Sequence, residues 1–255
     1  LTEPQAGSDL SDLRTRAVPQ TDGSYRLFGS KIFISWGEHD LTDNIVHLVL
    51  ARTPGAPEGS RGISLFLAPK VLVNADGSLG APNDIRCTRL EEKMGLHGSP
   101  TCAMTYGADS GAVAYLVGAE NKGLAAMFTM MNAERLYVGL QGVGVAERAY
   151  QAAFAYARDR RQGRADGAPN AARLLEHPDV RRMLFAMKSR IEGARAICYM
   201  TAIAADEAAV EEDPEDRAFA KRREEILTPI AKAWSTDMAL AVTSLGLQVH
   251  GGMGY

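Results

Sequence analysis

The chain opens on Leu1-Thr2-Glu3-Pro4-Gln5-Ala6-Gly7-Ser8-Asp9, a stretch of small, turn-forming and hydroxyl-bearing residues. The Gly7-Ser8 pair lies between the hydroxyl of Thr2 and the carboxyl of Asp9, and glycine lets a ligand approach the backbone closely. Such a loop leaves backbone N–H groups free beside hydroxyl donors. It suits a phosphate or the polar edge of a flavin, although loops of this composition also serve as plain turns.

A second informative stretch is Lys31-Ile32-Phe33-Ile34-Ser35-Trp36-Gly37. In a β-strand, residues two positions apart share a face, so Phe33 and Ser35 are expected to point the same way. One side chain can then pack against a planar ring while the other donates a hydrogen bond to its edge. The pair by itself is also typical of a half-buried strand with a satisfied serine.

The first part of the chain, up to about residue 112, alternates short apolar runs with turn signals. Asp22-Gly23 and residues 74–78 are predicted turns, and Pro69 ends an apolar run. Short strands at this spacing predict a β-barrel or a sandwich. We therefore expect a β domain over residues 1–115. Its predicted strands lie at 25–28, 31–36, 45–51 and 62–68.

The rest of the chain has a helical pattern. Apolar residues recur every three or four positions over about 123–160, which predicts one long helix. A second helix is expected from Pro178 to about 211, and a third from about 229 to 248. Long helices joined by short loops imply an antiparallel bundle over residues 120–255, which a fourth helix can close.

The composition describes a soluble globular protein, with 46% hydrophobic and 23% charged residues. A net charge of −3 provides no general attraction to nucleic acid or anionic membrane, and no apolar run approaches the ~20 residues of a membrane helix. The three cysteines lie far apart, which favours free thiols in a reducing compartment. We expect no metal site, and interpret the acidic run 211–216 as a solvated turn.

Four motifs, taken together, resemble the acyl-CoA dehydrogenase family of flavoproteins. They are T-E-P-x-A-G-S-D at 2–9, G-x-K-x-[FW]-I-[ST] at 29–35, R-x-Q at 160–162 and Q-V-H-G-G-M-G-Y at 248–255. The resemblance implies an α+β multidomain fold in which a β-barrel middle domain is followed by an antiparallel helical bundle. It also implies that the family's N-terminal helical domain and C-terminal end are missing from this sequence.

The resemblance assigns flavin contacts in the β domain. Thr2 would reach the pyrimidine edge of FAD, and Ser8, next to Gly7, would reach its pyrophosphate. Phe33 stands where the family usually has Trp and would cover the ring. Ser35 stands where the family usually has Thr and would donate toward N5. Both departures keep the chemistry, with less aromatic area and one methyl group fewer.

The resemblance also assigns residues of the bundle to the FAD of a neighbouring subunit. Arg160 and Gln162 match the R-x-Q motif, and a guanidinium is well shaped for a pyrophosphate. Gln248, Gly251 and Gly252 match the turn that holds the adenosine half of the same FAD. A cofactor shared in this way implies a homodimer or a homotetramer.

The implied reaction is α,β-dehydrogenation of an acyl-CoA thioester, in which a carboxylate takes the α-proton and the β-hydride goes to flavin N5. The base should be a Glu in a dry, apolar pocket that raises its pKa. Most family members carry it just beyond the final glycine motif, a segment this sequence lacks after Tyr255. A minority carry it on the long helix before an arginine, which Glu134-Arg135 matches.

Two interpretations of Glu134 therefore stay open: it is the base, or it is a helical carboxylate while the base lies beyond Tyr255. Arg135 is expected near the acyl-CoA or the base. Ser99 is a candidate contact to pantetheine or phosphate, within a segment that resembles the border of the family's CoA channel.

Inserts around 74–84 and 108–112 resemble the branch of larger enzymes that includes 3-methylthiopropanoyl-CoA dehydrogenases, and suggest a short or sulfur-containing acyl chain. Electrons would pass to an electron-transfer flavoprotein. The alternatives are an acyl-CoA oxidase that uses oxygen, and a family member with a DNA-binding or assembly role; the net charge of −3 argues against DNA. The expected location is the bacterial cytoplasm, or the mitochondrial matrix in a eukaryote.

Overall fold

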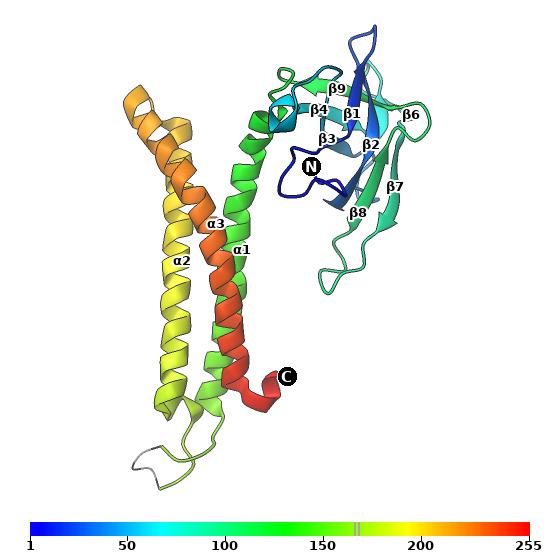
Figure 1. The fold of residues 1–255 in the computed structure, drawn as a ribbon. Helices are drawn as coiled ribbons and strands as arrows, with labels where there is room; N and C mark the ends of the chain where they lie inside the picture. The colour runs from blue at the N-terminus through cyan, green and yellow to red at the C-terminus, as the bar shows by residue number, and fades with distance from the viewer. Residues whose placement is uncertain (166, 168) are drawn as a thin grey trace. The chain divides into compact units, whose positions relative to one another are not determined.

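The computed structural model describes residues 1–165, 167 and 169–255, and the chain forms two compact units, Leu1–Met130 and Met131–Tyr255 (Figure 1). Each unit has its own apolar core. The division falls inside helix α1 (Gly123–Asp159), after the last strand. The predicted domain limits, 1–115 and 120–255, stay predictions.

The first unit is built on an antiparallel seven-stranded sheet, in which β1 also pairs with β2, with a separate β5–β6 hairpin. The path order is β3-β4-β9-β2-β8-β7. The strands are β1 (Arg16–Pro19), β2 (Tyr25–Ser35), β3 (Val46–Ala51), β4 (Ser64–Pro69), β5 (Val71–Val73), β6 (Leu79–Pro82), β7 (Ile85–Leu90), β8 (Thr101–Tyr106) and β9 (Ala112–Val117).

The predicted barrel is not closed. Among the described residues no strand pairing joins β3, at one end of the path, to β7 at the other. The sheet instead turns around β2, whose first residues pair with β9 and whose later residues pair with β8. The apolar core of this unit includes Leu27, Val49, Phe66 and Met104.

Strand β2 joins two runs that the sequence predicts separately. Gly29 lies between the two runs, where the strand passes close to Thr15. A Cβ on residue 29 would lie 2.4 Å from Oγ1 of Thr15, so only glycine fits this close approach. The register shifts between Lys31 and Ile34, and Phe33 has a φ of 57°. These features mark a β-bulge, which bends the strand and redirects its side chains.

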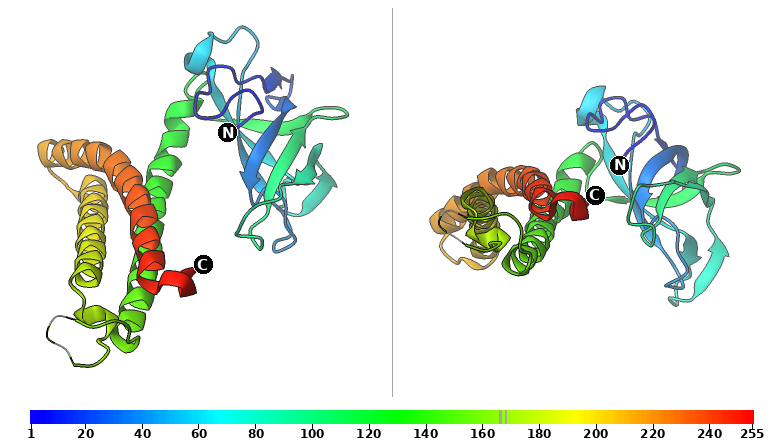
Figure 2. Two further views of the ribbon diagram at one scale, coloured as in Figure 1. Left: turned by 60° about the horizontal axis from the view of Figure 1, so that its bottom comes forward. Right: turned by 90° about the horizontal axis from the view of Figure 1, so that it is seen from below.

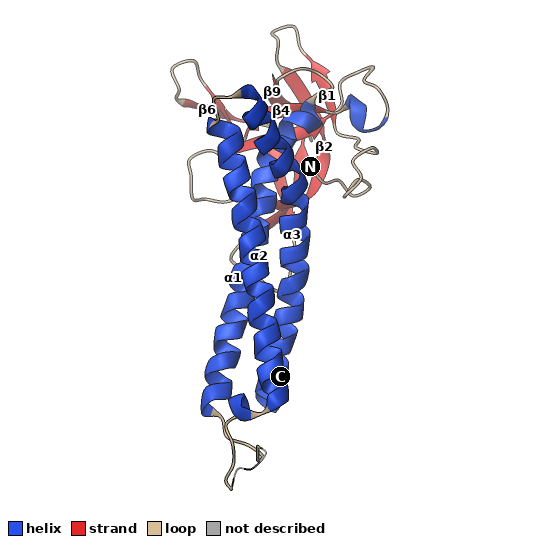
Figure 3. Cartoon of the chain, turned by 90° about the vertical axis from the view of Figure 1, so that its left-hand side faces the viewer, coloured by secondary structure: helices blue, strands red, loops and turns tan. Residues whose placement is uncertain are grey.

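The described part of the second unit consists mainly of α1 together with α2 (Pro178–Val210) and α3 (Pro214–His250). Figure 3 shows the three helices side by side. The first two agree with the predicted helices. The predicted start of the third, near 229, is wrong, because Asp213 caps an earlier start by accepting hydrogen bonds from the backbone N–H of Glu215 and Asp216.

Pro229 therefore lies inside α3. A proline lacks the N–H that would bond to the preceding turn, and its ring pushes against that turn, so an interior proline bends a helix. Figure 2 shows the resulting curvature of α3. Burial of Ala231, Met238 and Val242 against the bundle core maintains the helix through the bend.

The glycines of α1 allow helix packing at close range. A Cβ on Gly142 would lie 2.7 Å from the carbonyl oxygen of Ser235 in α3, and one on Gly139 would lie 3.0 Å from that of Ala231. The backbones of α1 and α3 are thus in contact. A Cβ on Gly144, by contrast, would meet nothing within 4 Å.

Replacing Gly142 by Ala is expected to lower the free energy of unfolding by about 1–3 kcal/mol, because the added methyl group meets rigid backbone. The matched control is Gly144→Ala, which is expected to raise the free energy of unfolding by roughly 0.5–1 kcal/mol through helix propensity alone. Urea unfolding of both variants measures the difference. Equal stabilisation by the two alanines would contradict the packing described here.

No helix within the described residues has the length and apolar character needed to cross a membrane.

Candidate functional site

The opening loop lies directly against strand β2. The backbone N–H of Ile32 donates to the carbonyl oxygen of Thr2 over 3.0 Å, and Glu3 and Ala6 exchange two backbone hydrogen bonds of 2.9 and 3.0 Å. The structure therefore brings together the two motifs that the sequence singles out, the loop with Thr2 and the strand with Ser35.

A buried ion pair between Glu3 of the loop and Lys31 of β2 also joins these two motifs. Nζ of Lys31 lies 2.8 Å from Oε1 of Glu3, and the two side chains are only 1% and 3% exposed. The same Nζ donates to the carbonyl oxygens of Leu50 (2.8 Å) and Leu1 (3.3 Å). All three protons of the ammonium group therefore have acceptors, as a buried charge requires.

The carboxylate of Glu3 has further donors besides Lys31. It accepts hydrogen bonds from the backbone N–H of Arg14 (2.7 Å) and Thr15 (3.0 Å) and from the hydroxyl of Thr15 (2.5 Å). Burial by itself would raise the pKa of Glu3, but the hydrogen bonds from Lys31 and Thr15 lower that pKa to about 2. Burial lowers the pKa of Lys31, against the opposing effect of Glu3.

This pair makes the β unit sensitive to acid. Because the folded pKa of Glu3 is about 2 and its ordinary value is 4.5, its contribution to stability is present above pH 4.5 and is lost as the pH falls toward 2. The melting temperature is expected to fall across this interval. In Glu3→Gln, which has no proton to gain here, the fall should be shallower; identical pH profiles would contradict the assignment.

The predicted flavin contacts of the β unit are accessible. Phe33 is 60% exposed in its bulge, Ser35 is exposed, and Thr2 is half-buried. A Cβ on Gly7 would meet nothing within 4 Å, and Ser8 beside it is exposed. Within the described part of the chain, the hydroxyls of Thr2 and Ser35 have no hydrogen-bond partner. Open backbone, free hydroxyls and an exposed aromatic ring fit what a flavin requires.

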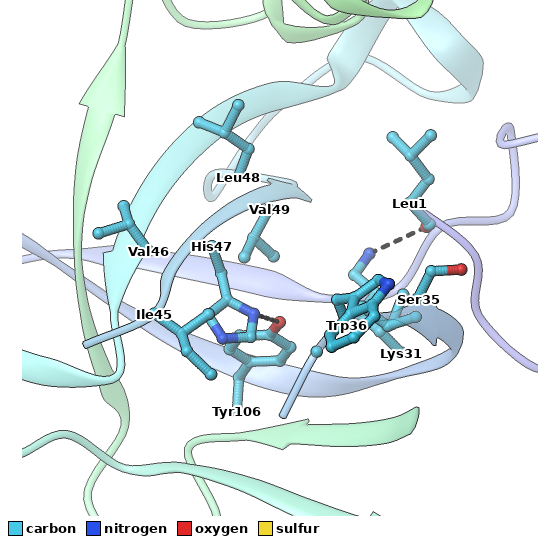
Figure 4. Close-up of a pocket in the computed structure, with 12 residues that line it drawn as sticks. Leu1, Lys31, Ser35, Trp36, Ile45, Val46, His47, Leu48, Val49 and Tyr106 are labelled. Atoms are coloured by element: carbon cyan, nitrogen blue, oxygen red, sulfur yellow. Dashed lines mark hydrogen bonds between the residues drawn. The ribbon is translucent and has the colours of Figure 1, made fainter. Parts of the chain in front are cut away.

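A cavity of about 200 Å³ opens beside Ser35 (Figure 4). Ser35 and Trp36 lie at one end of it, and a buried pair, His47 and Tyr106, lies at the other. The Tyr106 hydroxyl is 2.9 Å from Nδ1 of His47. Burial lowers the pKa of His47 and raises that of Tyr106, which favours the neutral form of both side chains. No local sequence pattern indicates this pair, because its residues lie in different strands.

The predicted FAD residues of the bundle gather at one end of it. Arg160 and Gln162 follow the last turn of α1, while Gln248 lies in the last turn of α3. The rings of Tyr156 and His250 stack with centroids 4.6 Å apart, which holds the two helix ends together. Gly251 and Gly252 come next in the chain, and Gly251 has a φ of 60° that favours glycine.

The R-x-Q segment is also held by its own neighbours. The carbonyl oxygen of Arg160 accepts from the backbone N–H of Leu174 (2.9 Å), and that of Gln162 lies 2.9 Å from Nε2 of His177. The side chains of Arg160 and Gln162 are exposed. The backbone is therefore fixed, while the side chains stay available to a ligand. His177 is a supporting residue that the sequence analysis missed.

Glu134 and Arg135 lie on α1. Glu134 is exposed, so the described residues do not supply the dry, apolar pocket expected around a catalytic base. Nη1 of Arg135 lies 3.4 Å from Oδ1 of Asn132, one turn earlier. The role of each residue stays a prediction.

Ser99 belongs to the β7–β8 loop, beside a pocket of about 600 Å³. Nζ of Lys93 donates to the carbonyl oxygen of Ser99 and, over 3.0 Å, to the hydroxyl of Thr101. His97 lines the same pocket. The loop thus places a hydroxyl and a cation near one another, which is compatible with a phosphate or amide ligand.

Both units match models of one protein family. Residues 1–108 match the acyl-CoA dehydrogenase middle domain, and residues 121–255 match the acyl-CoA dehydrogenase C-terminal domain. The chain therefore belongs to the acyl-CoA dehydrogenase family, as the resemblance implies. The α+β fold with an antiparallel sheet and a helical bundle is confirmed, apart from the closure of the barrel and the start of α3.

Individual relatives agree with this. Over its whole length the chain is 54% identical to 3-methylmercaptopropionyl-CoA dehydrogenase of Ruegeria pomeroyi and 40% identical to a butyryl-CoA dehydrogenase of Syntrophomonas wolfei. It spans 43% of the length of each. Its structure resembles that of Caenorhabditis elegans ACDH-11 in complex with C11-CoA, with a TM-score of 0.81, 27% identity, and coverage of all of this chain and 40% of that one.

Proposed function

We propose that the protein to which this chain belongs catalyses the FAD-dependent α,β-dehydrogenation of an acyl-CoA thioester. The main support within the structure is the contact between the Thr2 loop and the Ser35 strand, which exposes two free hydroxyls beside an exposed Phe33. Family membership supports the same reaction.

In this proposal, the residues of the β unit bind the flavin. Thr2 and Ser35 donate hydrogen bonds to the pyrimidine edge and toward N5, and Phe33 covers the ring. Gly7 and Ser8 contact the pyrophosphate. When bound, FAD supplies the acceptor for the hydride that leaves the β-carbon.

Residues of the bundle have two proposed roles. Arg160, Gln162 and the turn of Gln248, Gly251 and Gly252 bind the FAD of a second copy, so the protein is a homodimer or homotetramer. Glu134 takes the α-proton of the thioester, with Arg135 nearby; the alternative base is a carboxylate beyond Tyr255. Ser99 contacts the pantetheine or a phosphate of CoA.

The proposed substrate has a short or sulfur-containing acyl chain, supported by the 54% identity to 3-methylmercaptopropionyl-CoA dehydrogenase. The proposed electron acceptor is an electron-transfer flavoprotein. The proposed location is the bacterial cytoplasm, or the mitochondrial matrix in a eukaryote, consistent with free thiols at Cys87, Cys102 and Cys198.

Anaerobic titration of the full-length protein with a panel of acyl-CoAs tests the proposal. We expect a flavin absorbance spectrum that bleaches with butyryl-CoA or 3-methylthiopropanoyl-CoA and less with long-chain thioesters. Slow reoxidation in air is expected of a dehydrogenase, whereas rapid reoxidation would indicate an oxidase. A protein that retains no flavin, or a flavin that no acyl-CoA bleaches, would overturn the proposal.

A further inference from the structure

We infer that the buried Glu3–Lys31 ion pair positions the Thr2 loop against the Ser35 strand and thereby sets the spacing of the flavin's hydrogen-bond donors. This inference rests on the proposed function, because it assigns a purpose to the pair only if Thr2 and Ser35 hold a flavin. Glu3 and Lys31 are then positioning residues that act through their neighbours.

The contacts of Lys31 show how this positioning works. Its ammonium group bonds to the carbonyl oxygen of Leu1 and to the carboxylate of Glu3, the residues on either side of Thr2. Between them, the carbonyl oxygen of Thr2 accepts from the backbone N–H of Ile32. The three consecutive residues Leu1, Thr2 and Glu3 are therefore all bonded to β2, two of them through the side chain of Lys31 and one through the backbone N–H of Ile32.

The position of Lys31 within β2 extends its effect toward Ser35. The register shift begins immediately after Lys31 and ends at Ile34, whose side chain packs against the sheet core. Lys31 is also bonded to the carbonyl oxygen of Leu50 in β3. The residue before the bulge is thus anchored to β3, and the residue after it to the core, which restricts where Phe33 and Ser35 can point.

Glu3 fixes the other side of the loop. Its carboxylate receives the backbone N–H groups of Arg14 and Thr15 and the hydroxyl of Thr15. An apolar pair of similar volume could fill the same space, and buried ion pairs are often no more stabilising than such a replacement. The charged pair adds a directional constraint, because each of its hydrogen bonds requires a defined donor–acceptor geometry between the loop and the strand.

A double-mutant cycle on FAD binding tests the inference. In the full-length protein freed of its flavin, Thr2→Ala and Ser35→Ala are each expected to weaken FAD binding by roughly 3-fold to 10-fold, the effect of losing one hydrogen bond. Lys31→Met is expected to weaken it by on the order of 10-fold to 100-fold, as for other groups that orient ligand-binding residues. In the Lys31→Met background, Thr2→Ala should have almost no further effect. FAD fluorescence measures the dissociation constants, and circular dichroism confirms that each variant is folded.

The matched control is Ile85→Ala, which removes a buried side chain from the same sheet core at a position on β7, a strand that pairs with β8 and not with β2. At a temperature where both variants are folded, the factor for Thr2→Ala should be unchanged in this background. If Lys31→Met does not fold, Glu3→Gln replaces it. Glutamine has nearly the same volume, but it removes the charge and replaces one of the two accepting oxygens by an NH2 group that cannot accept.

Two different results would overturn the inference. If Thr2→Ala weakens FAD binding by the same factor with and without Lys31→Met, the pair only stabilises the fold, and the proposed flavin site stands. If neither Thr2→Ala nor Ser35→Ala changes FAD binding in the otherwise unaltered protein, the flavin site itself is misassigned and the inference fails with it.

Discussion

Replacing Glu134 by Gln is expected to slow the anaerobic bleaching of the flavin by acyl-CoA by about 10²-fold to 10⁴-fold, the usual contribution of a general base. Glutamine has the same shape as glutamate but cannot take the α-proton. FAD content and acyl-CoA binding should change little, because the substitution removes only a proton acceptor. Stopped-flow absorbance at saturating acyl-CoA measures the bleaching rate directly.

The matched control is Glu147→Gln, on the same helix. Glu147 forms ion pairs with Arg195 (2.8 Å) and Lys188 (3.9 Å), and these pairs, on α2, give it a structural role. Its replacement is expected to reduce stability and to leave the bleaching rate intact. An unchanged rate in Glu134→Gln would remove Glu134 as the base and favour the alternative, a carboxylate beyond Tyr255.

The second large effect concerns folding. Lys31→Met is expected to lower the free energy of unfolding by about 3–5 kcal/mol, because the carboxylate of Glu3 would stay buried without its cation. The double variant Glu3→Gln with Lys31→Met should recover much of this loss, since an amide is far less costly to bury than a charge. Urea unfolding at pH 7 measures all three proteins.

An exposed ion pair provides the comparison. Lys221 lies 2.7 Å from Glu224 on α3, and its side chain is 51% exposed. Lys221→Met is expected to change the free energy of unfolding by less than about 1 kcal/mol. If Lys31→Met cost no more than Lys221→Met, burial would not determine the strength of the Glu3–Lys31 pair, and its proposed positioning role would lose its basis.

Local sequence patterns predicted α1 and α2 well because their apolar periodicity is long and uninterrupted. They failed at α3, where Pro229 suggested a beginning. The stronger local signal was Asp213 followed by Pro214, a capping residue before a proline in the first turn. Packing of Ala231 and Val242 in the bundle core then outweighs the bend at the proline.

The candidate site shows the same difference between local and distant information. Ordered motifs predicted Thr2, Ser35, Arg160 and Gln248 as cofactor contacts through the family resemblance. The supporting residues could not be identified, because nothing local distinguishes a lysine that will be 1% exposed from one on the surface. Lys31 becomes buried only when the loop, β2 and β3 come together.

By itself, the sequence determined the family, the order of a β unit before a helical unit, and the residue types of the proposed flavin site. Only the tertiary structure decided that the sheet stays open, that Phe33 sits in a bulge, and that Glu3 and Lys31 meet. The physical reason is the separation of the interacting residues along the sequence. Periodicity and capping act within a few residues, whereas strand pairing and the burial of a charge depend on segments that are distant along the chain.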